Sequence, residues 1–282
     1  MAPTSRPTRT TPEPPLCPAS GWPRLYSWPL PELSSVADRI LLRLLCRIAS
    51  RQIALIDGWE NVLSRQDPFL LVSNHSSRRE AVFLPAILML ARGGRAVRFL
   101  ADWNFRLIPG IGYLYAMSDA IILTRKDARP RILNLLRPRY EPEVPALTEA
   151  KNHLERGGSV GIFPEGTVNR NADRLARGHR GAARLSLETG TPVLPVGIRF
   201  ARHPRLTGRI DSTSAMSIHF GAAISPPPRE REPIPPRSVT LWNLRLMAEI
   251  GRLCGKEGHE TPHGQPKHLV GNGLHERSSP LY

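Results

Sequence analysis

The sequence GSVGIFPEGTVNRN, residues 158–171, sets a short apolar segment directly before a proline, a carboxylate, a glycine and a threonine. Its apolar part, residues 159–164, is typical of a strand that is buried on both faces of a parallel sheet. Glu165 follows at once, although carboxylates are rarely buried without a partner. The carboxyl end of a buried strand is where α/β sheets present side chains to ligands. The sequence therefore predicts a ligand site at the end of this strand.

A second stretch, VSNHSSRRE at residues 72–80, also places polar residues directly after an apolar segment. His75 follows the strand-like residues 69–74 and precedes a predicted helix at 80–92, so we expect it in the turn between them. A histidine there can act as a general base near neutral pH. A turn that folds Glu80 back onto the imidazole would fix its tautomer while the other ring nitrogen accepts a proton. A lone histidine beside a solvated glutamate is the alternative for this stretch taken alone.

Strand and helix patterns alternate along residues 53–225, which predicts an α/β fold: a single domain with a mixed, mostly parallel sheet flanked by helices. The first two strands are expected to be joined by a polar turn. The predicted strands are 53–58, 69–74, 96–102, 120–125, 159–164, 192–200 and 216–224, and the predicted helices are 80–92, 146–157 and 180–190.

The segments outside this domain are less regular. Residues 1–33 are rich in proline and are predicted to be disordered. After the domain we expect a proline-rich linker at 226–237, an amphipathic helix at 238–254 and a disordered tail at 255–282.

Residues 34–52, directly before the domain, have the pattern of a basic amphipathic helix. Such a helix can lie in a lipid headgroup layer, with its apolar side down and its arginines toward the phosphates. A helix packed on the domain with a solvated arginine face is the alternative. The basic side holds Arg39, Arg43, Arg47 and Arg51, and the predicted apolar side holds Ile40, Leu41, Leu44, Leu45 and Ile48.

The composition narrows the class of protein. A formal net charge of +15 attracts polyanions, namely nucleic acids, anionic lipid surfaces or phosphorylated substrates. The sequence has no pair of strands rich in aromatic and basic residues, no zinc-ligand pattern and no recognition helix, so it gives no support for nucleic-acid binding.

The three cysteines are widely spaced, which gives neither a disulfide framework nor a metal site. The longest apolar run, residues 81–91, is too short to span a bilayer, so we expect a soluble or membrane-surface protein.

Two further turns hold candidates for substrate binding. Arg125 ends the predicted strand 120–125, and arginine suits bidentate binding of phosphate. After the predicted strand 159–164, Gly166 lets a ligand approach the main chain closely, and Thr167 offers a hydroxyl group. Taken alone, the alternatives are an exposed basic turn for Arg125 and a plain strand-to-loop turn for Gly166 and Thr167.

The order and spacing of these pieces resemble those of the glycerolipid acyltransferase family, of the lysophosphatidate acyltransferase type. His75 lies in the first block, and Arg125 ends the strand of the second block about fifty residues later. FPEGT at 163–167 forms the third block, and PVLPV at 192–196 corresponds to the fourth. The resemblance covers about residues 53–224.

In that family a histidine deprotonates an acceptor hydroxyl, which attacks an acyl thioester of coenzyme A or acyl carrier protein. The resemblance implies that His75 is the catalytic base and Glu80 its partner. It implies phospholipid biosynthesis with a lyso-lipid acceptor, most simply 1-acyl-sn-glycerol-3-phosphate, and an acyl-CoA or acyl carrier protein co-substrate, with no metal or other cofactor. The protein would attach peripherally to an anionic membrane surface, at its cytoplasmic face. The acceptor would be bound by Arg125, Glu165, Gly166, Thr167 and Arg170.

Two positions depart from the family pattern. Glu80 stands where the family has aspartate, and its extra methylene changes the reach of the carboxylate. Val168 stands where an arginine commonly follows the third block, so either Arg170 substitutes for it or the acceptor lacks the usual phosphate. Arg78 and Arg79 are further candidates for substrate phosphates, with a solvated face as the alternative. A catalytically weak chain that binds membrane surfaces is the alternative function.

Overall fold

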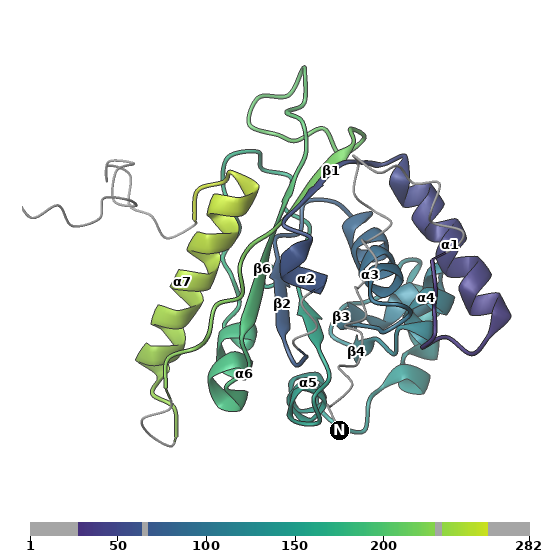
Figure 1. The fold of residues 1–282 in the computed structure, drawn as a ribbon, viewed down its shortest axis with the longest axis horizontal. Coiled ribbons are helices and arrows are strands. Elements are labelled where there is room, and N and C mark those ends of the chain that lie inside the picture. The colour runs from purple at the N-terminus through teal and green to yellow at the C-terminus, as the bar shows by residue number, and fades with distance from the viewer. Residues whose placement is uncertain (1–27, 64–66, 229–232, 259–282) are drawn as a thin grey trace, which may run out of the picture.

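A seven-stranded sheet runs through the part of the protein that the structure describes, with helices on both of its faces (Figure 1). The structure is a computed structural model, and it describes residues 28–63, 67–228 and 233–258. The strands lie in the order β1-β7-β6-β2-β5-β3-β4. Their bounds are β1 Ile53–Asp57, β2 Leu70–Ser73, β3 Arg98–Asp102, β4 Ile121–Leu123, β5 Val160–Ile162, β6 Val193–Arg199 and β7 Met216–Phe220.

The sheet is mixed and mostly parallel, which confirms the predicted fold class. β2 lies between β5 and β6 and is parallel to both, and β3 and β4 continue the parallel part. β7 runs antiparallel to β6, and β1 pairs with β7. β2 and β5 are buried along their whole length because they occupy the centre of the sheet. Since these neighbours are parallel, the residues that follow them emerge at the same edge of the sheet.

The helices cover the two faces of the sheet as two layers. They are α1 Val36–Ser50, α2 Glu60–Leu63, α3 Glu80–Ala91, α4 Ile111–Met117, α5 Ala146–Glu155, α6 Gly181–Thr189 and α7 Pro236–Cys254, with the 3-10 helices η2 Trp103–Leu107 and η3 Arg131–Tyr140. One hydrophobic core includes side chains of α1, α3 and α4, and the other includes those of α5, α6 and α7 (Figure 1). α3 is almost entirely buried between the sheet and α1, which explains why its sequence has no polar face.

Several connections differ from the sequence prediction. β1 and β2 are joined through α2 and not by a polar turn alone, and β1 pairs with the distant β7. α7 begins at Pro236, inside the predicted linker, because proline is favoured at the first position of a helix. The predicted disordered tail begins too early, since Lys256 is buried against the domain.

The prediction of disorder for residues 1–33 is wrong for the last part of that segment. Leu30 and Leu33 are buried and belong to the core on the α1 side of the sheet. Residues 1–27 and 259–282, for which disorder is also predicted, lie outside the described residues.

The face of α1 that packs on the domain differs from the apolar side predicted from the sequence. Leu42, Cys46 and Ala49 are buried, and the Cys46 sulfur lies 3.4 Å from the carbonyl oxygen of Ala86 in α3. One side of the helix therefore packs on the domain, and its other side is left for contact with solvent or lipid. Much of the predicted apolar side nevertheless faces outward, and the large apolar residues that are exposed are Val36, Ile40, Leu44 and Ile48.

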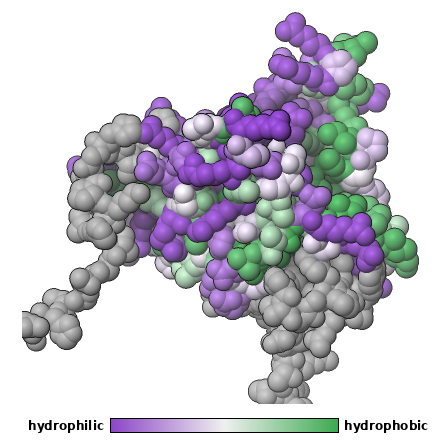
Figure 2. Space-filling view, turned by 90° about the horizontal axis from the view of Figure 1, so that it is seen from above, coloured by the Kyte–Doolittle hydropathy of each residue, from purple (hydrophilic) through white to green (hydrophobic). Residues whose placement is uncertain are grey.

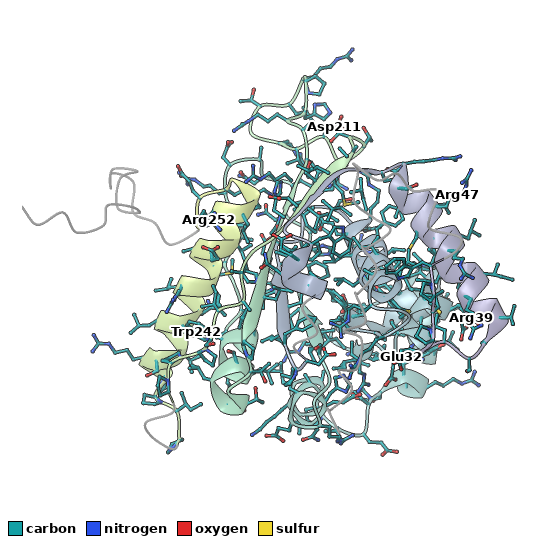
Figure 3. The ribbon with its side chains drawn as sticks, viewed as in Figure 1. Glu32, Arg39, Arg47, Asp211, Trp242 and Arg252 are labelled. Carbon is teal, nitrogen blue, oxygen red and sulfur yellow. The ribbon has the colours of Figure 1, made fainter. Side chains whose placement is uncertain are left out.

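The arginines of α1 do not form a single basic face. Arg39 and Arg43 donate hydrogen bonds to main-chain carbonyl oxygens of the preceding segment, at 2.7 and 3.1 Å. Arg47 and Arg51 are exposed near the C-terminal end of the helix. Figure 3 shows Arg39 and Arg47 on α1, at the outer side of the molecule. The outward surface of α1 is thus apolar with two arginines at one end.

Candidate active site

His75 and Glu80 form a hydrogen-bonded pair beyond the carboxyl end of β2. Nδ1 of His75 lies 2.9 Å from Oε2 of Glu80, the contact that the sequence predicts. Because an ionised carboxylate only accepts hydrogen bonds, this contact assigns the ring proton to Nδ1 and leaves the lone pair on Nε2. Among the described residues no group bonds to Nε2, and the histidine side chain is 13% exposed. The pair can therefore take a proton from a hydroxyl group that reaches Nε2.

Glu80 is held by more than the histidine. Its fully buried carboxylate also accepts hydrogen bonds from the amides of Ser76 (2.8 Å) and Ser77 (3.0 Å), so it folds back over the turn before its own helix. Burial raises the pKa of Glu80, and the hydrogen bonds from His75 and the two amides act in the opposite direction. Three N–H donors around one carboxylate favour its charged form.

Neighbouring side chains orient the imidazole and attach its turn to the sheet. The ring of Phe163, which follows β5, stacks on the His75 ring with centroids 4.5 Å apart. The buried Asn74 side chain bridges β2 to β6: it accepts from the amide of Ile198 at 2.7 Å and donates to the carbonyl oxygen of that residue at 2.9 Å. The turn that carries His75 is therefore fixed to both neighbours of β2.

Glu165 lies beside His75, but its carboxylate is engaged by main-chain and side-chain amides. Oε1 accepts the amide of His75 at 2.9 Å, and Oε2 accepts the side-chain amide of Asn169 and the amide of Ala176, both at 2.8 Å. Glu165 is only 3% exposed. Both carboxylate oxygens are thus engaged within the protein, and binding of the acceptor by Glu165 stays a prediction. The carboxylate joins the loops that follow β2 and β5, and so holds the histidine in place.

Asn169 and Lys126 also hold the site together, a role that the sequence does not predict for either residue. The amide of Asn169 donates to the carbonyl oxygen of His75 at 2.7 Å. Lys126 donates to the carbonyl oxygen of Gly166 (2.8 Å) and pairs with Asp102 (3.0 Å), which links the ends of β3 and β4 to the loop after β5. No pattern in the sequence marks these contacts, because they depend on which strands are neighbours.

The remaining predicted acceptor-binding residues lie at the same edge of the sheet but do not form one cluster. Arg125 follows β4, three strands from β2, which corresponds to about 14 Å at the usual strand spacing. The side chains of Arg125, Thr167 and Arg170 are exposed, and no other described residue engages them. Gly166 has a φ of +64°, and a Cβ there would lie 3.0 Å from the ring of His179, so this turn requires glycine.

Arg79 is engaged in hydrogen bonds within the protein. Its guanidinium donates to Gln52 and to the carbonyl oxygens of Ser212 and Ser214, which attaches the turn after His75 to the segment after β6. Arg78 is exposed.

Within the described ranges, no group of three or more His, Cys, Asp or Glu side chains is arranged to hold a metal ion. In the same part of the chain, no helix is both long enough and apolar enough to cross a membrane.

The sequence model of a family described as "Acyltransferase" matches residues 56–199, about half of the chain. The chain belongs to the acyltransferase family. The matched span includes His75, Glu80 and the FPEGT block, and the predicted family is confirmed. The acyltransferase match ends before β7 and α7, so the contacts that these elements make lie outside it.

Curated proteins similar to this chain carry closely related names. Two chloroplast proteins named 1-acyl-sn-glycerol-3-phosphate acyltransferase, BAT2 of Brassica napus and LPAT1 of Arabidopsis thaliana, are each 31% identical to it over 163 residues. This match covers 58% of the chain but only 40% and 39% of the two relatives. A protein of the same name from Borreliella burgdorferi is 27% identical and is matched over 58% of its length. The chain thus spans about two fifths to three fifths of the curated relatives that it matches.

A solved structure supports the fold of this chain. The crystal structure of the 1-acyl-sn-glycerophosphate (LPA) acyltransferase PlsC from Thermotoga maritima superimposes with a TM-score of 0.52. The superposition covers 80% of this chain and 85% of the other, at 20% sequence identity. The two proteins therefore share the α/β fold.

Proposed function

We propose that this acyltransferase moves a fatty acyl group from an acyl thioester to the hydroxyl of a lyso-lipid, most simply 1-acyl-sn-glycerol-3-phosphate. The observation that carries the proposal is the pair of His75 and Glu80, with Nδ1 held at 2.9 Å and Nε2 without a partner among the described residues. The names of the curated relatives support the choice of acceptor. Phospholipid biosynthesis is the pathway that this reaction would serve.

The geometry suits direct transfer without an acyl-enzyme intermediate. Nε2 of His75 takes the hydroxyl proton of the acceptor while the hydroxyl oxygen attacks the carbonyl carbon of the thioester. The C–S bond then breaks, and the imidazolium gives its proton to the departing thiolate. Glu80 stabilises the positive charge of the imidazolium between these two steps and keeps the ring oriented.

The exposed arginines at this edge of the sheet are suited to the headgroup of the acceptor. Arg125 and Arg170 have no side-chain partner among the described residues, and a guanidinium can bind phosphate through two hydrogen bonds. Arg170 lies two positions after Val168, where the family pattern has an arginine. A lyso-lipid without a phosphate is the alternative acceptor, and the valine is the observation that favours it.

The test of the proposal is the release of free thiol from acyl-CoA in the presence of lysophosphatidate. We expect His75→Ala to lower this rate by roughly 10²- to 10⁴-fold, the usual contribution of a general base. His219→Ala is the control, because His219 lies on β7 and pairs with Asp57, away from the site. Unchanged thiol release in His75→Ala would refute the mechanism.

A screen of acceptors and donors separates the finer alternatives. Lyso-lipids with and without phosphate are supplied with one acyl-CoA, and the products are identified by mass spectrometry. The reaction is then repeated with acyl carrier protein as the donor. Acylation of a phosphate-free lyso-lipid in preference to lysophosphatidate would overturn the proposed acceptor. An absence of acyl transfer to every acceptor would leave the alternative of a membrane-surface binding protein.

We also propose that α1 attaches the protein peripherally to an anionic membrane, at its cytoplasmic face. The outward side of α1 exposes Ile40 (61%) and Leu44 (52%), with Arg47 beside them. Figure 2 shows hydrophobic side chains among hydrophilic ones on the right-hand side of the molecule, where Figure 1 has α1. Apolar side chains flanked by arginine fit the boundary between acyl chains and anionic headgroups.

A further inference from the structure

Lys256 is a buried cation directly behind the turn that carries the catalytic pair. It is 7% exposed, and its Nζ donates a hydrogen bond of 2.9 Å to Oγ of Ser76, which is fully buried. Lysine is almost never buried without a charged partner. Nevertheless, among the described residues no carboxylate lies within ion-pair distance of this ammonium. A close ion pair therefore does not explain why this ammonium is buried here.

The segment after α7 is built to bring Lys256 to this place. The amide of Lys256 turns back to the carbonyl oxygen of Gly251 at 2.9 Å, and a Cβ on Gly251 would lie 2.6 Å from the carbonyl oxygen of Lys256. The chain then pairs with the loop after β5 through its main chain. The amide of Glu257 donates to the carbonyl oxygen of Asp173 (2.7 Å), and the carbonyl oxygen of Glu257 accepts from the amide of Leu175 (2.9 Å). Figure 3 shows Arg252, near the end of α7, toward the same upper edge as Asp211, which follows β6.

The hydrogen bond from Lys256 completes a chain of contacts that ends at the imidazole. Ser76 Oγ also accepts from the side-chain amide of Asn74 at 3.1 Å, so two donors occupy the two lone pairs of this hydroxyl. The amide of Ser76 donates to Glu80 at 2.8 Å, and Glu80 accepts from His75 at 2.9 Å. A shift of Ser76 would therefore change the position of the carboxylate that holds the ring.

We infer that Lys256 is a positioning residue for the pair of His75 and Glu80, acting through Ser76. The segment that follows α7 then belongs to the active unit, although it lies outside residues 56–199, which match the family. The inference deepens the proposed function and rests on it, because it assigns a role in the reaction of His75. Its immediate consequence is structural: without the lysine, the imidazole is less firmly held in the tautomer protonated at Nδ1.

The test uses Lys256→Met in the full chain, since methionine fills similar space without the charge or the hydrogen bond. ¹⁵N NMR of labelled histidine, assigned with His75→Gln, reports the tautomer of His75. We expect the Nδ1-protonated form in the wild type and an increased share of the Nε2-protonated form in Lys256→Met. The expected loss in kcat is on the order of 10-fold to 10²-fold, the latter being the effect of a misplacement of about 1 Å, with little change in KM. Lys256→Arg, which keeps the charge and a donor, should recover part of the loss.

Two further variants make the outcome decisive. Lys151→Met is the matched control, because Lys151 is the partly exposed partner of Glu188 and lies far from Ser76 in sequence and contacts. Ser76→Ala removes the acceptor and keeps the lysine, so it decides the question if Lys256→Met does not fold. An unchanged tautomer and an unchanged kcat in folded Lys256→Met, or in Ser76→Ala, would overturn the inference. If the wild type releases no thiol, the proposed function fails, but the tautomer still decides whether Lys256 positions His75.

Discussion

Glu80 is one methylene longer than the aspartate of the family pattern, and the structure uses this length. From the first residue of α3 its carboxylate reaches both His75 (2.9 Å) and the amide of Ser76 (2.8 Å). Aspartate would withdraw the carboxylate by about 1.5 Å, the length of one C–C bond. We therefore expect Glu80→Asp to lower kcat by roughly 10- to 10²-fold, although it restores the residue usual in the family. Thiol release at saturating substrate measures the effect.

The matching control for this substitution is Glu155→Asp. Glu155 is exposed at the end of α5, and no described contact depends on the length of its side chain. This variant should retain the wild-type rate. A higher kcat in Glu80→Asp would show instead that the glutamate lowers the catalytic rate.

Glu165 offers a second test at this scale, because its carboxylate is predicted to bind the acceptor but accepts three hydrogen bonds within the protein. Glu165→Gln places an NH₂ group against one of the three donors from His75, Asn169 and Ala176. We expect the free energy of unfolding to fall by about 1–3 kcal/mol, the cost of an unsatisfied buried group. Denaturant unfolding measures this loss, and KM for the lyso-lipid should stay the same. A large rise in KM with unchanged stability would instead show that Glu165 binds the acceptor.

At the scale of elements, an ion cluster joins α3 to the amino ends of β2 and β5. Asp67, before β2, pairs with Arg92 (2.6 Å) and Arg95 (3.0 Å) and accepts from the hydroxyl of Ser159, before β5. Burial alone would raise the pKa of Asp67. The hydrogen bonds from Arg92 and Ser159 and the charges of both arginines outweigh it, and they lower the pKa below the ordinary value of 3.8.

This lowered pKa gives the stability a defined dependence on pH. A carboxyl group whose pKa is lower in the folded state stabilises the protein above its unfolded pKa, and this contribution is lost as the pH falls through the folded pKa. We expect Asp67→Asn to cost roughly 3 kcal/mol near pH 7, because it leaves the buried Arg92 without its charged partner. Urea unfolding at several pH values should show the difference from the wild type shrinking below the ordinary pKa of 3.8. A difference that does not change with pH would contradict this assignment.

The elements also show what could be predicted from the sequence. The contact of His75 with Glu80 is local, and Glu165 comes close because β2 and β5 are parallel neighbours, so an alternating pattern of strands and helices was enough to expect one site. The direction of the Glu165 carboxylate was not predictable, because it depends on amides supplied by Asn169 and Ala176. Lys256 was missed because a polar glycine-containing tail has no periodicity from which to infer burial.

At the scale of the whole molecule, the helical pattern of α1 was predictable but its orientation was not. The buried face follows from the contact of Cys46 with α3, a contact between elements about forty residues apart. Once this face is used, the apolar residues that remain form an outward strip on the side of the molecule away from α7 (Figure 1). The net charge of +15 then favours an anionic surface as the partner of this strip.

The proposed attachment to membranes can be tested by substitution, whereas deletion of α1 would uncover the core that Leu42 and Cys46 close. We expect Ile40→Asp with Leu44→Asp to weaken binding to anionic vesicles by roughly tenfold or more, since each removes an apolar side chain from the lipid boundary. Leu241→Asp with Leu244→Asp is the matched control, because these two residues are exposed on α7, at the opposite side of the molecule. Sedimentation with phosphatidylglycerol and with phosphatidylcholine vesicles, at low and high salt, separates the charge contribution, which salt screens, from the apolar one. Equal losses in the two double variants would show that net charge, and not the outward strip of α1, attaches the protein.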